Sequence, residues 1–131
     1  MQAATVRRFP HVPAGAGETY NVIGELLTLK VTNAQTDGAF TVVELLARPG
    51  GGPPLHTHPS SESFTILEGE FEFTGLACGQ PYTFRAVPGD TVFIPAAAPH
   101  TRRSAMSLAR RCSSSHRERR WSSSSLRRVC G

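Results

Sequence analysis

The sequence predicts an all-β fold, either an antiparallel barrel or a jelly roll. Short segments alternate apolar and polar residues with a period of two, and no segment has the period of an amphipathic helix. Turn signals recur about every 8–12 residues, because 12 Gly and 10 Pro punctuate the 131 residues. A chain of this length has room for one domain with one hydrophobic core.

Six segments carry the strand pattern. In the first, Leu27, Leu29 and Val31 alternate with polar residues, and in the fourth Phe71 and Phe73 share one face. The predicted strands cover residues 26–32, 39–48, 63–67, 70–74, 82–87 and 91–95.

Residue pattern and charge together divide the chain into three parts. Residues 1–20 are predicted to be an extended arm and residues 21–104 the β-barrel domain. Residues 1–100 carry five basic and nine acidic residues, a net charge of −4, whereas residues 101–131 carry nine arginines and one acid, a net charge of +8. The tail, residues 105–131, is rich in Arg and Ser and has no period, so it is predicted to be irregular or disordered.

Composition also bounds location and partners. No apolar run approaches the roughly 20 residues that span a bilayer, and no secretory signal is recognised at residues 1–15. We therefore expect a cytoplasmic protein without a membrane partner. Because the basic charge is confined to a tail with a single aromatic residue, Trp121, no nucleic-acid partner is expected.

The cysteine pattern does not predict a disulfide framework. Cys78, Cys112 and Cys130 are odd in number and irregularly spaced. Cys78 is expected to be a reduced thiol, and none of the three is expected to contribute to a functional site.

Residues 50–69 carry the pattern that points to chemistry. His56 and His58 are two apart, so on an extended segment both side chains point to the same side, and Glu62 follows with the same parity. Isolated surface histidines are the simpler interpretation of any one of them. Three ligand-type residues of one parity favour a mixed nitrogen and oxygen metal site instead. His100 follows a strand-like segment, and strand pairing would bring it opposite the other three.

These residues resemble the cupin superfamily. The first cupin motif is matched at every fixed point, namely Gly50, His56, His58, Glu62 and Gly69. The second motif is matched at Gly89, Pro95 and His100, but Ala97 stands where Gly is usual and Ser104 where Asn is usual. The resemblance covers about residues 20–100. It implies an antiparallel double-stranded β-barrel, the cupin jelly roll, in which His56, His58, Glu62 and His100 bind one divalent transition metal: Fe, Mn, Ni, Cu or Zn.

Two functions follow from the resemblance. The first is a mononuclear metal-dependent enzyme, a dioxygenase-like oxidoreductase acting on a small organic molecule, with Glu62 as a catalytic base; decarboxylase, cyclase and isomerase activities stay open. The second is a non-catalytic cupin that binds or senses a small molecule. Retention of all four ligand residues favours the enzyme. Phe64 and Ile66 are expected to face the metal cavity, and the resemblance implies a homodimer.

The departure from the cupin pattern begins just after His100. Small cupins continue with a turn and an aliphatic strand, whereas this chain continues with an Arg and Ser tract. A reading-frame shift in the coding DNA near residues 101–104 is the favoured explanation, and a natural basic tail is the alternative. In either case a missing strand would leave an unpaired sheet edge.

Overall fold

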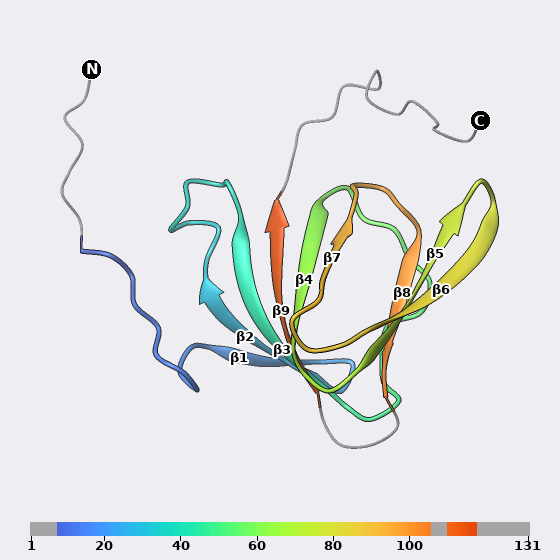
Figure 1. Ribbon diagram of the computed structural model, residues 1–131. Helices are drawn as coiled ribbons and strands as arrows, with labels where there is room; N and C mark the ends of the chain where they lie inside the picture. The colour runs from blue at the N-terminus through green and yellow to red at the C-terminus, as the bar shows by residue number, and fades with distance from the viewer. Residues whose placement is uncertain (1–7, 106–109, 118–131) are drawn as a thin grey trace, which may run out of the picture.

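Alternating apolar residues form antiparallel strands in the computed structural model, which describes residues 8–105 and 110–117 (Figure 1). The described residues form no helix, as the sequence predicts. The strands are β1 (Thr19–Val22), β2 (Glu25–Val31), β3 (Thr41–Ala47), β4 (Ser61–Glu68), β5 (Phe71–Ala77), β6 (Gln80–Ala86), β7 (Thr91–Ile94), β8 (His100–Ser104) and β9 (Arg110–Arg117).

The strands assemble into two sheets that face each other (Figure 1). The larger sheet has the order β1-β2-β3-β9-β4-β7, and the smaller has the order β6-β5-β8. All pairs are antiparallel. This arrangement confirms the predicted all-β jelly roll.

The core lies between the two sheets, because alternate residues of the central strands point inward. Its buried members are Leu45, Ala47, Phe64, Ile66, Phe71, Phe73, Ala86 and Ile94. Burial of one such large side chain contributes about 1.5–3 kcal/mol to stability. The core therefore draws on both sheets, with Phe64 and Ile66 from β4 and Phe71 and Phe73 from β5.

Strand β9 lies within the tail that the sequence predicts to be irregular. It pairs with β3 on one side and with β4 on the other, where His116 is in register with Glu62. This corrects the expectation for residues 110–117. The physical reason is that a sheet ladder is made by backbone groups, so two open edges can accept an Arg- and Ser-rich segment. The remaining tail residues, 106–109 and 118–131, lie outside the described residues.

Two further features differ from the expectation. Strands β1 and β8 were not among the predicted segments; all four residues of β1 are exposed, so no hydrophobic alternation marks it. Cys78, in the turn between β5 and β6, is disulfide-bonded rather than a reduced thiol. A single sequence does not specify which cysteines meet in space.

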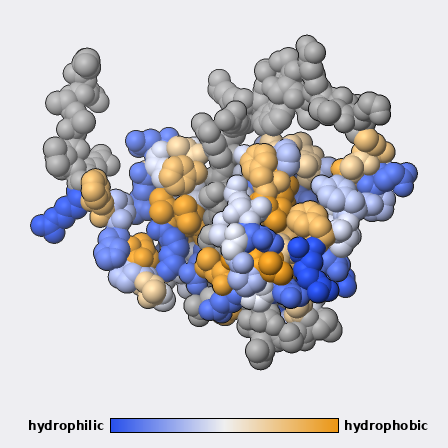
Figure 2. Space-filling view, in the orientation of Figure 1, coloured by the Kyte–Doolittle hydropathy of each residue, from blue (hydrophilic) through white to orange (hydrophobic). Residues whose placement is uncertain are grey.

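The described part of the N-terminal arm, residues 8–18, forms no helix or strand. It runs beside β2, where the Lys30 Nζ donates to the Ala16 carbonyl at 2.7 Å and the Leu29 amide donates to the Glu18 carbonyl at 2.8 Å. No helix in the described part of the chain is long and apolar enough to cross a membrane. On the face shown in Figure 2, hydrophobic residues form separate patches among hydrophilic ones.

Candidate metal centre

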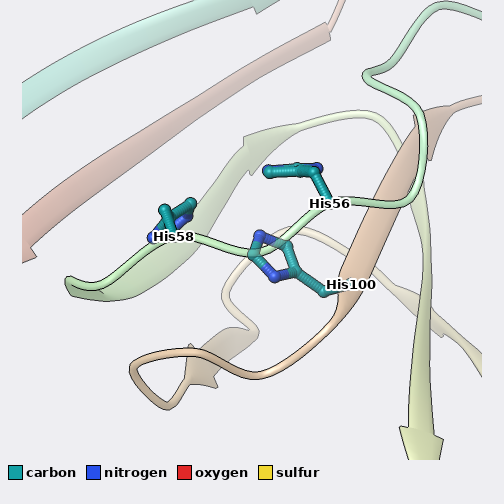
Figure 3. A group of neighbouring side chains, drawn as sticks. All are labelled: His56, His58 and His100. Atoms are coloured by element: carbon teal, nitrogen blue, oxygen red, sulfur yellow. The ribbon is translucent and has the colours of Figure 1, made fainter.

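His56 and His58 lie on the extended segment that leads into β4, as their spacing predicts (Figure 3). His56 forms an isolated antiparallel bridge with His100, in which each backbone amide donates to the other's carbonyl, at 3.1 and 3.0 Å. The carbonyl of His58 accepts from the Ala97 amide at 2.8 Å. The backbone therefore ties this segment to the loop that precedes β8.

The three imidazoles gather at one place (Figure 3). Their ring centroids are 4.4 Å apart for His56 and His100, 5.0 Å for His58 and His100, and 5.6 Å for His56 and His58. One ring nitrogen from each lies within 4.8 Å of the others, so the three histidines are placed to hold a metal ion.

Glu62, from β4, completes the group predicted from the sequence. Its Oε1 lies 3.1 Å from the His100 Nε2 and 3.3 Å from the His58 Nε2. The side chains of Glu62 and His100 are almost fully buried, at 5% and 7% exposed. All four predicted residues thus come together from two sheets and a loop.

The backbone contact of each Nδ1 determines which ring nitrogen carries the hydrogen. The Nδ1 atoms of His56, His58 and His100 each lie 2.8 Å from a backbone carbonyl oxygen, those of Pro54, Ser60 and Ala98. A carbonyl only accepts, so each Nδ1 must be the donor. In the neutral ring the Nε2 therefore presents a lone pair.

This tautomer makes the centre suited to a cation. The Nε2 lone pairs of His58 and His100 face the Glu62 carboxylate oxygen, and two acceptors at hydrogen-bond distance need a proton or a cation between them. Donation of the other ring N–H to a carbonyl is also the usual support of metal-bound histidine. The donor set of three nitrogens and one carboxylate thus fits a transition-metal ion.

The centre opens into a cavity of about 240 Å³ between the two sheets. Its walls are mainly apolar and include Leu27, Val43, Leu45 and Phe64. Phe64 therefore faces the cavity as predicted, whereas Ile66, 1% exposed, belongs to the core beneath it.

Comparison with protein families agrees with this geometry. Residues 43–106 match the family model described as Cupin domain. This segment is a cupin domain. A comparison with curated protein sequences found no match.

Solved structures share this fold over more of the chain than the family model covers. The oxalate decarboxylase of Lactobacillus farciminis, solved as a formate complex, superposes with a TM-score of 0.74 at 19% identity over 94% of this chain and 36% of that chain. The Schizosaccharomyces pombe Cnp3 cupin domain gives 0.64 at 19% identity over 76% of this chain and 65% of that one. An oxalate oxidase structure gives 0.66 at 22% identity over 84% and 59%. This chain thus spans about a third of the decarboxylase's length.

Sequence reasoning missed two residues of the cupin cavity. Glu25 and Arg102 line it as a buried ion pair. Glu25 lies just before the predicted strand of residues 26–32, and Arg102 lies in the tract that departs from the cupin pattern, so no motif marks either one. A buried charge of each sign in one cavity is visible only after folding.

Proposed function

We propose that His56, His58, Glu62 and His100 hold one divalent transition metal and that the domain is a mononuclear metal-dependent enzyme, a dioxygenase-like oxidoreductase. The observation that carries the proposal is that the Nδ1 of each of the three histidines lies 2.8 Å from a backbone carbonyl oxygen. Each Nδ1 is committed to a carbonyl, so each Nε2 is left as a ligand atom, and two of them face the Glu62 carboxylate.

The mixed nitrogen and oxygen set suits Fe, Mn, Ni, Cu or Zn. When bound, such an ion supplies Lewis acidity and, for a redox-active metal, electron transfer to or from a substrate. The chain itself contributes the enclosure, since the walls around the polar cluster are mainly apolar. In this proposal Glu62, which is buried beside two imidazoles, accepts a proton from a substrate in the cavity.

A small organic substrate is supported by the size of the cavity. Its volume of about 240 Å³ is below the 300–1,000 Å³ or so of pockets for drug-sized ligands. Two of the similar structures are named for enzymes that act on oxalate, a small organic acid. Because these proteins share only 19% and 22% of their residues with this chain, the likeness supports a small substrate but does not say which compound it is.

Metal analysis tests the proposed centre. Protein purified without chelators should contain about one metal ion per chain, and His56→Ala, His58→Ala or His100→Ala should each abolish stoichiometric metal, because one of four ligands is lost. His11→Ala is the matched control, since His11 is exposed on the N-terminal arm. Full metal occupancy in the double variant of His56 and His58 would contradict the assignment.

The reaction class is tested separately on the metal-loaded protein. Oxygen uptake in the presence of a panel of small organic acids and enolisable ketones should reveal turnover that the His100→Ala variant lacks. Tight ligand binding at the metal-loaded centre with no turnover of any kind would instead favour the non-catalytic binding cupin.

A further inference from the structure

A buried ion pair occupies the cavity wall beside the candidate metal centre. The Nη1 and Nη2 of Arg102 donate to the two carboxylate oxygens of Glu25 at 2.7 and 2.8 Å. The two side chains are only 9% and 10% exposed. Both residues line the same cavity as the three histidines and Glu62.

The fold places this pair from both sheets. Arg102 follows His100 by two residues on β8, so the two share one face of the strand, and its guanidinium lies 5.5 Å from the centre of the Phe64 ring. Glu25 begins β2 directly after the tight turn of Ile23 and Gly24, whose φ angles are 51° and 80°. The pair therefore joins the β1–β2 hairpin to the strand that carries a predicted ligand.

Stability alone does not account for such a pair. The desolvation of two charges offsets most of their attraction, and well-packed apolar residues of similar volume often serve as well or better. The surrounding wall is already apolar, with Leu27, Val43 and Phe64 among its members. The presence of a carboxylate and a guanidinium in this wall is better explained by a role in binding the ligand of the cavity.

Charge balance identifies the class of that ligand. Among the described residues, the charged groups that line the cavity are the carboxylates of Glu62 and Glu25 and the guanidinium of Arg102, which together with a divalent ion leave one positive unit. An uncompensated buried charge is costly, so the best complement is a ligand of charge −1. Without Glu25 the same cavity would carry two positive units and would favour a dianion.

We propose that the cavity takes a small monoanionic organic acid with two chelating oxygens and an apolar body, and that Glu25, through its charge, sets this specificity. The apolar body would lie against Leu27, Val43 and Leu45, and the chelating oxygens would face the histidine cluster. This inference rests on the proposed metal site and adds the ligand's charge to it.

Three phenyl-bearing probes of graded charge test it on zinc-loaded protein by calorimetry. They are 1-phenylethane-1,2-diol, mandelate and phenylmalonate, which are neutral, monoanionic and dianionic. Mandelate should bind at least about tenfold more tightly than either of the others. Glu25→Gln should shift the preference toward phenylmalonate by about tenfold or more, whereas the double variant Glu25→Gln with Arg102→Gln restores the net charge and should return the preference to mandelate. Glu72→Gln, exposed on β5, removes the same charge far from the cavity and should change nothing.

The outcomes separate the two proposals. Absence of bound metal from the wild-type protein contradicts the proposed function. Zinc-loaded wild-type protein that binds phenylmalonate or the diol as tightly as mandelate overturns the charge inference, and this measurement needs no variant to fold. An unchanged preference in zinc-loaded Glu25→Gln overturns the role of Glu25.

Discussion

At the scale of single residues, the candidate centre is defined by what lies behind each imidazole. Backbone carbonyls two residues before His56 and His100, and two after His58, receive the Nδ1 hydrogens. Local chain geometry thus selects the tautomer before any ion binds.

Replacement of the Glu62 carboxylate by an amide should weaken metal binding without abolishing it. The dissociation constant should rise by about tenfold or more, but by less than in His100→Ala, since the amide oxygen still coordinates. Calorimetric titration of the metal-free variants with the metal ion measures both constants, and unchanged metal affinity in Glu62→Gln would contradict its role as a ligand.

At the scale of elements, the turn before β8 explains a departure from the cupin motif. The Ala98 amide donates to the Pro95 carbonyl at 3.2 Å, and Ala97, the third residue of this turn, has φ +63°. That conformation is the reason a glycine is usual there. The Ala97 amide also donates to the His58 carbonyl, so the strained turn holds the two halves of the site together.

Ala97→Gly should stabilise the protein. Relief of the left-handed conformation is worth about 1–2 kcal/mol, which exceeds the roughly 0.4–1 kcal/mol lost through the more flexible unfolded chain. We expect a net gain of up to about 1 kcal/mol in denaturant unfolding, with unchanged metal content. Ala96→Gly is the control; Ala96 is buried and is not among the residues with positive φ, so this change should destabilise. Equal effects of the two would contradict the role assigned to the turn.

At the scale of the whole molecule, the candidate centre links the two sheets. Glu62 belongs to β4 of the larger sheet and His100 to β8 of the smaller one, and His56 and His58 lie on the segment between β3 and β4. An ion held by all four would act as a cross-link between the two layers. Metal binding and folding should consequently be coupled.

Chelation should lower the melting temperature. At a free metal concentration 100-fold above the dissociation constant, the bound ion adds about 2.7 kcal/mol to stability, which corresponds to roughly 10 °C for a domain of this size. EDTA should remove this increment, and an excess of metal should restore it. His100→Ala should melt at one temperature with or without metal, and a metal-dependent shift in that variant would show that the ion stabilises the protein elsewhere.

The sequence by itself determined most of the fold and predicted the residues of the candidate site. Period-two alternation depends only on which face of a strand is buried. The burial of residues such as Leu45 and Phe73 can therefore be predicted from their neighbours in the sequence. The spacing of His56, His58 and Glu62 likewise gives a shared side on an extended chain. These features are readable because they arise between near neighbours in the chain.

The tertiary structure decided what depends on distant segments. The pairing of Glu25 with Arg102 joins residues 77 positions apart, and neither has a local pattern that predicts the other. Strand β9 forms where β3 and β4 leave backbone groups to be paired, although its own residues lack apolar alternation. Periodicity reports side-chain burial, whereas open backbone hydrogen bonds and buried charges are satisfied by whichever segment the fold brings beside them.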